Sequence, residues 1–155
     1  MADRVSASII LGGRITTSEF AELSSIIAAE DLSIEWDGPT FKSTDRTIGE
    51  PLHLNAHQVP WGCFETLESW CVKKKLPFAR WSGGCPGSFD AERVVFTGDG
   101  EPTFYTVDED DCVVIGRRTV NDLGSIEAIL AHFAAADFQI PSLVVDGDPT
   151  QEPQT

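Results

Sequence analysis

The sequence predicts an α+β fold built on a duplicated β-α-β unit, in the ferredoxin-like order βαββαβ. Short apolar stretches with strand periodicity alternate with stretches whose apolar residues recur at helical spacing. Two such strand–helix–strand segments match when the second is shifted back by 44 residues, which aligns seven apolar positions without a gap. Right-handed crossovers then place the first and third strands in the middle of one sheet, with both helices on one face.

The first copy begins with the apolar strand SASIILGG at residues 6–13, which glycines close. A helix is expected from Thr16, because Thr16 and Glu19 have the spacing of a capping box. Alternating residues 32–36 predict the next strand, which the sequence DGP at 37–39 ends.

The second copy consists of a strand at 52–57, a helix at about 62–75 and a strand at 77–81. Matching the two copies aligns Ile10 with Leu54, so Ile10 is expected to face the helices. Ile9 and Leu11 would then lie on the opposite face of a central strand and would need a cover. The C-terminal third is the natural candidate for that cover.

Residues 92–145 are predicted to form a β-rich acidic extension of the βαββαβ unit, which itself spans residues 5–84. Strands are expected near 93–97, 103–107 and 112–116, and residues 143–145 are a candidate last strand. One helix at about 124–136 is expected to bury its apolar residues Ile126, Ile129, Leu130 and Phe133. The chain therefore reads as one domain over 1–145, followed by a polar tail at 146–155 that is expected to be disordered.

The net charge of −14 is concentrated near the C-terminus. Residues 99–155 carry a net charge of −10, and the first 98 residues carry −4. Such a surface repels nucleic acid and anionic membranes and attracts basic partners. The predicted partner-binding residues are the acidic side chains of two turns: Asp99, Glu101, Asp108, Glu109, Asp110 and Asp111.

No metal, cofactor or catalytic residue is assigned from the sequence. The four cysteines form no CxxC pair, and the run at 108–111 lacks the spacing of a calcium loop. Without a long apolar stretch, the chain is expected to be cytoplasmic, with its cysteines reduced.

An alternative pocket is considered around His53, Asn55, His57 and Cys63. Cys63 lies near a predicted helix N-terminus, where a thiolate is favoured, but no third residue is identified that would orient a histidine beside it. His53 and His57 share one strand face at about 13 Å, which is too far apart for one metal ion.

Together these features favour a non-enzymatic binding protein with a basic partner. In a narrower form it would be an inhibitor whose carboxylates replace phosphates on a nucleic-acid-binding surface. This small, acidic and motif-free profile is similar to that of anti-restriction and anti-CRISPR proteins. The alternatives are a small enzyme or metabolite-binding module, and a subunit that joins a larger assembly through a sheet edge or the Trp61, Trp70 and Trp81 region. The sequence leaves the oligomeric state open.

Overall fold

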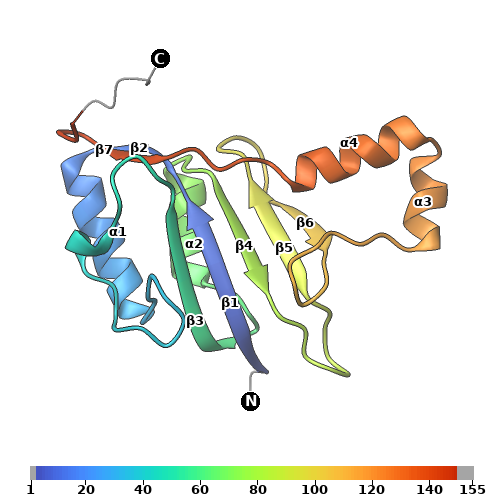
Figure 1. Ribbon diagram of the computed structural model, residues 1–155, viewed down its shortest axis with the longest axis horizontal. Helices are drawn as coiled ribbons and strands as arrows, with labels where there is room; N and C mark the ends of the chain where they lie inside the picture. The colour runs from blue at the N-terminus through green and yellow to red at the C-terminus, as the bar shows by residue number, and fades with distance from the viewer. Residues whose placement is uncertain (1–2, 150–155) are drawn as a thin grey trace.

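The computed structural model describes residues 3–149 and has a mixed α+β architecture (Figure 1). Its main sheet has five antiparallel strands in the order β3-β1-β4-β5-β6. The strands are β1 (Arg4–Leu11), β3 (Leu52–Pro60), β4 (Phe78–Ser82), β5 (Glu92–Phe96) and β6 (Thr103–Thr106). Helices α1 (Thr17–Ala29) and α2 (Glu65–Lys73) lie against one face of this sheet.

The core lies between these two helices and the sheet. Strand β1 contributes Ala7, Ile9 and Leu11, all of which are 0% exposed. They share one apolar cluster with residues of both helices: Leu23, Ile27, Leu67 and Cys71. The predicted register of β1 is therefore wrong by one residue, because Ile9 pairs with Leu54 and faces the helices. A slip of one residue exchanges the two faces of a strand, so Ile10 is the residue on the opposite face.

The N-terminus of α1 confirms the predicted capping box. The Thr16 hydroxyl accepts a hydrogen bond from the Glu19 backbone N–H at 3.1 Å, and the Glu19 carboxylate accepts one from the Thr16 N–H at 3.0 Å. Both bonds join residues three apart in sequence, which is why the local pattern alone predicts them.

The strand predicted at 32–36 is absent, and an isolated bridge between Ser33 and Asn55 takes its place. The chain then turns away from β3, with a backbone hydrogen bond from Gly38 N–H to the Glu35 carbonyl at 3.1 Å. Asp37 adopts a positive φ of 60° in this turn. Because the turn follows so closely, the alternating pattern of this segment leaves Trp36 44% exposed instead of paired in a sheet.

Strands β5 and β6 extend the sheet beyond β4, but the third strand expected near 112–116 is reduced to a bridge between Val107 and Val113. Helix α3 (Arg117–Leu123) was not predicted, and the helix expected at 124–136 is α4 (Ile126–Ala136). The candidate last strand is confirmed as β7 (Leu143–Val145), which pairs in parallel with β2 (Gly13–Ile15). A short 3₁₀ helix spans Ser43–Asp45.

The C-terminal third covers part of the second face of the sheet. Arg93 on β5 attaches this segment to the sheet, because its guanidinium donates to the Ala136 carbonyl and to the Asp137 carboxylate, both at 2.8 Å. Ile10 and Ala79 line a cavity of about 450 Å³ beside residues 136–140. The cover expected for the second face is thus present, although it lies over Ile10 and not over Ile9 and Leu11.

The start of the predicted tail is held by ion pairs. Asp146 pairs with Arg14, and Asp148 pairs with the nearly buried Arg46, whose guanidinium lies 5.2 Å from the centre of the Phe20 ring. Residues 150–155, the rest of the predicted tail, lie outside the described residues.

Candidate functional site

The predicted acidic residues occupy opposite ends of the β5–β6 hairpin. Glu92 pairs with Thr106 at one end of this hairpin, and Val95 pairs with Thr103 at the other. Asp99 and Glu101 therefore extend from the second end, and residues 108–111 extend from the first. Five strand residues, about 17 Å, separate the two groups.

Three of the four acidic side chains at 108–111 stabilise the fold. The Asp108 carboxylate accepts hydrogen bonds from the backbone N–H groups of Asp110 and Cys112, both at 2.9 Å. Glu109 accepts one from Gly84 N–H at 2.9 Å, and Asp111 accepts one from Arg93 Nε at 2.9 Å. The run of acids thus closes a turn and joins it to the sheet. Asp108 and Glu109 are exposed in spite of these bonds, as are Asp110, Asp99 and Glu101, whereas Asp111 is half-buried.

Three arginine side chains are largely buried and form internal ion pairs. The Arg80 side chain is 2% exposed, that of Arg46 10% and that of Arg93 13%. Together they pair with five carboxylates: Glu68, Glu92, Asp111, Asp137 and Asp148. Three of the eleven Lys and Arg side chains are therefore held in internal ion pairs, and the remaining eight face a larger number of carboxylates at the surface.

Arg80 is the centre of a polar cluster below α2. Its guanidinium donates to Glu68 at 3.0 Å, to Glu92 at 3.2 Å and to the Ser82 hydroxyl at 3.0 Å. The Cys63 sulfur lies 3.6 Å from its Nη2. Burial raises the pKa of Glu68 even though Arg80 lowers it.

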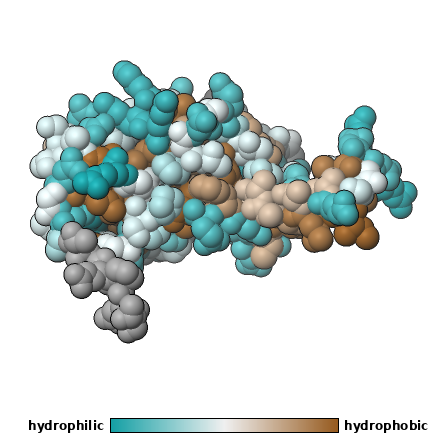
Figure 2. Space-filling view, turned by 90° about the horizontal axis from the view of Figure 1, so that it is seen from above, coloured by the Kyte–Doolittle hydropathy of each residue, from teal (hydrophilic) through white to brown (hydrophobic). Residues whose placement is uncertain are grey.

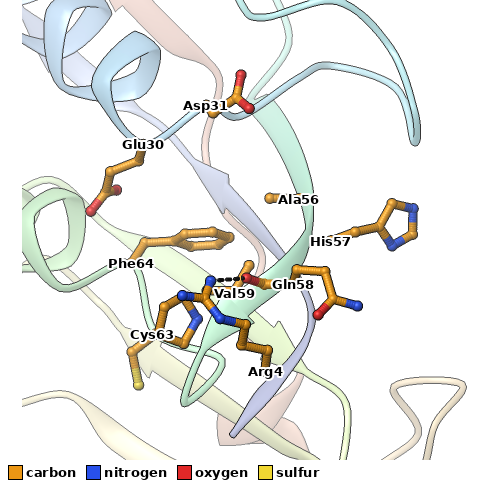
Figure 3. A pocket seen from close by; sticks show the side chains of 10 residues that line it. Arg4, Glu30, Asp31, Ala56, His57, Gln58, Val59, Cys63 and Phe64 are labelled. Atoms are coloured by element: carbon orange, nitrogen blue, oxygen red, sulfur yellow. Dashed lines mark hydrogen bonds between the residues drawn. The ribbon is translucent and has the colours of Figure 1, made fainter. Parts of the chain in front are cut away.

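The Cys63 thiol is exposed but is not activated. The pKa of the thiol is raised overall, chiefly because neighbouring atoms partly shield it from water. The Arg80 charge lowers this pKa, whereas the charges of Glu68 and Glu92 raise it. Cys63 and His57 line the same pocket of about 300 Å³, yet their side chains point away from each other (Figure 3). No Cys–His pair forms there.

The four residues of the predicted alternative pocket are not brought together. His53 lines a different hollow, beside Glu35 and Glu50. Asn55 is 5% exposed, and its amide donates to the Ile34 carbonyl at 3.3 Å, so it has a structural role at the edge of β3. Only His57 and Cys63, among these four, share a pocket in the described part of the chain.

His57 has two neighbours that the sequence did not point to. Its Nδ1 lies 2.8 Å from the Ser6 hydroxyl, and its Nε2 lies 3.2 Å from the Asp37 carboxylate. Because a carboxylate only accepts, Nε2 carries a proton, and in the neutral imidazole Nδ1 then accepts from the Ser6 hydroxyl. The Trp36 ring packs on the imidazole at 4.8 Å between centroids. Ser6 and Asp37 lie 51 and 20 positions from His57 in the sequence, so no local motif reveals this arrangement.

Helices α3 and α4 form an arm that projects from the sheet (Figure 1). Figure 2 shows hydrophobic side chains gathered on this arm, with hydrophilic side chains beside them. Ile126 is 74% exposed and Leu130 is 62% exposed, so the prediction that these two residues are buried is wrong. Helical spacing correctly predicted α4 itself, but not which of its faces packs on the body. Ile129 and Phe133 are half-buried.

No protein family, curated protein or solved structure matches this chain. Among residues 3–149, no helix has the length and apolar character needed to cross a membrane. Within the same residues, no group of three or more His, Cys, Asp or Glu side chains is placed to hold a metal ion.

Proposed function

We propose that this protein is a non-enzymatic cytoplasmic binding protein whose acidic surface engages a basic partner protein. The observation that carries the proposal is the excess of carboxylates over basic side chains, which gives the chain a net charge of −14. Arg46, Arg80 and Arg93 are held inside the molecule by carboxylates, whereas Asp99, Glu101 and Asp110 extend into solvent. An excess of solvent-facing carboxylates attracts a positively charged surface and accelerates its association.

In the narrower form of this proposal the partner is a nucleic-acid-binding protein that the chain inhibits. Phosphates recur about every 3.4 Å along one DNA strand. The two acidic ends of the β5–β6 hairpin are about 17 Å apart, which corresponds to roughly five phosphate steps. The carboxylates would thus replace two separated phosphate groups, and not a continuous row of phosphates along a strand.

Affinity capture at increasing salt concentration tests this proposal. The immobilised chain is compared with the triple variant Asp99→Asn, Glu101→Gln, Asp110→Asn. A matched control, Glu35→Gln, Glu50→Gln, Asp122→Asn, removes the same charge from exposed residues elsewhere. We expect a captured protein to be lost with the first triple variant, retained with the control and released by salt or by added DNA. Capture that resists salt and survives the first triple variant contradicts the proposal.

The hydrogen-bonded chain Ser6–His57–Asp37 favours a second candidate, a small hydrolase. A hydroxyl that donates to a histidine is the first part of a nucleophilic triad. The Asp37 side chain, however, is 84% exposed, and an aspartate that orients a catalytic histidine is normally buried. A fluorophosphonate probe discriminates: labelling of Ser6 that Asp37→Asn abolishes supports the hydrolase, and no labelling excludes a reactive Ser6.

We further propose that residues 4–82 are a ferredoxin-like unit with a reduced second strand. The order β3-β1-β4 and the position of α1 and α2 on one face support this reading. The Ser33–Asn55 bridge lies where the second strand of such a unit would pair with β3.

A further inference from the structure

We infer that the α3–α4 arm is a self-association surface, on which α4 packs against α4 of a second copy in an antiparallel arrangement. This inference goes beyond the binding of a basic partner and does not depend on it. It starts from the unusual composition of α4, in which Glu127 and His132 are the only polar residues among eleven. A helix that is apolar nearly all round is normally buried on every side.

The body of the protein covers only the inner side of α4. There His132 packs edge-on against Tyr105 at 5.1 Å between ring centroids, and Ala136 is buried. The outer side is a continuous exposed stripe at i, i+1, i+4, i+5, i+8 and i+9: Ile126, Glu127, Leu130, Ala131, Ala134 and Ala135. Residues with this spacing form one face of a helix and can pack as ridges into the grooves of another helix.

The sizes of these side chains make the stripe complementary to itself. The larger residues Ile126, Glu127 and Leu130 lie in its N-terminal half, and alanines fill its C-terminal half. In an antiparallel pair related by a two-fold axis, the large half of each helix meets the small half of the other. Leu130 lies near the middle of α4 and therefore near that axis. Facing large and small residues pack closely without voids.

The charge distribution favours a second copy over a basic protein at this surface. Residues 117–136 contain Arg117, Arg118, Asp122 and Glu127, so the arm has no net charge although the chain carries −14. A basic partner gains nothing electrostatically from a neutral surface. Two acidic copies, by contrast, repel each other least where the local charge is zero.

The dimer is expected to be weak. A helix of eleven residues is about 16 Å long, so the buried area falls below the roughly 1,200 Å² of standard interfaces. We therefore expect a dissociation constant on the order of micromolar or weaker. Salt should strengthen the dimer because it screens the repulsion between two copies of charge −14. This is opposite to the effect of salt on a basic partner.

Sedimentation equilibrium of the full chain over a range of concentrations and at two salt concentrations tests the inference. Leu130→Glu should abolish the dimer, and Leu130→Lys should do the same. An equimolar mixture of the two variants should restore it, because Leu130 of one copy lies near Leu130 of the other. Phe104→Glu is the matched control, since Phe104 is 65% exposed but lies on β6, outside the arm.

Circular dichroism verifies that each variant is folded, as expected for exposed positions. A monomeric wild-type chain at millimolar concentration overturns the inference. A dimer that persists in the Leu130→Glu variant also overturns it. The same holds if Phe104→Glu dissociates the dimer and Leu130→Glu does not. The inference is supported if each Leu130 variant is monomeric and their mixture dimerises. This conclusion does not depend on the outcome of affinity capture.

Discussion

Arg80 and Glu68 form an ion pair inside the molecule, with 3.0 Å between Nε and Oε1 and side chains that are 2% and 15% exposed. Glu92 completes the cluster at 3.2 Å from the same guanidinium. A buried ion pair contributes little net stability over an apolar replacement, but removal of one member leaves an uncompensated charge. The pair therefore makes the core sensitive to single substitutions.

Arg80→Met should lower the free energy of unfolding by about 3 kcal/mol, because Glu68 would remain charged beside the core. Urea unfolding measures this loss. The loss should be larger at pH 7 than at pH 4, since protonation of Glu68 removes the unpaired charge. Arg80→Met combined with Glu68→Gln should lose less than Arg80→Met alone. A double variant whose loss equals the sum of the two single losses would show that the two residues are not coupled.

Glu30→Gln should stabilise the protein at neutral pH. Burial raises the pKa of Glu30; the backbone N–H groups of Thr66 and Leu67 lower it, and the charge of Glu68 raises it. One carboxylate oxygen of Glu30 is buried and has no hydrogen-bond partner in the described structure. Because its pKa is higher in the folded than in the unfolded state, Glu30 stabilises the fold most when it is protonated. This contribution to the free energy of unfolding is complete below the ordinary pKa of about 4.3 and is lost as the pH rises through the folded-state pKa.

Glutamine keeps an oxygen for those N–H groups but carries no charge to desolvate. The melting temperature of Glu30→Gln should therefore exceed that of the wild type at pH 7, and the difference should disappear near pH 4. Glu35→Gln, at an exposed residue, is the control and should change little at either pH. An equal gain from both variants would instead indicate a general relief of the acidic net charge.

The local features of this fold are predictable from sequence, and the features that depend on distant contacts are not. The capping box of Thr16 and Glu19 and the last strand β7 follow from short patterns. The face of β1 does not, because Ile9, Ile10 and Leu11 are all apolar and the pattern alone leaves the register ambiguous.

The same limit applies to the candidate sites. The acidic run at 108–111 reads as a free charged surface until the hydrogen bonds to Gly84 and Arg93 are seen. Burial of α4 was predicted from its periodicity, yet only the packing shows that its outer stripe lacks a cover. Composition does carry a signal there, since a helix with only two polar residues is seldom a surface helix of a monomer.

Arg93→Lys should loosen the C-terminal third without unfolding the core. The guanidinium joins β5 to Asp111, Asp137 and the Ala136 carbonyl at once, and a lysine amine cannot reproduce this planar geometry. We expect a loss of about 1–3 kcal/mol, moderated because Asp137 is 61% exposed.

Hydrogen exchange measured by mass spectrometry locates this effect. Exchange should accelerate in residues 108–113 and 133–140, while peptides from α1, α2 and β1 remain protected. Arg117→Lys, an exposed substitution on α3, serves as the control. Uniform acceleration over the whole chain would show that Arg93 supports global stability and not the attachment of this segment.

Cys63 should react with iodoacetamide no faster than a free thiol in solution. Its pKa is raised, chiefly by desolvation, and the thiolate is the reactive form. Arg80 is the main group that lowers this pKa, so Arg80→Met should slow the labelling of Cys63 further at pH 8. Cys71 is fully buried, and its thiol should label only after unfolding in urea. Mass spectrometry of the labelled peptides over time follows each site separately. If Cys63 is labelled faster than the thiol of glutathione, it is an activated thiol and a candidate nucleophile.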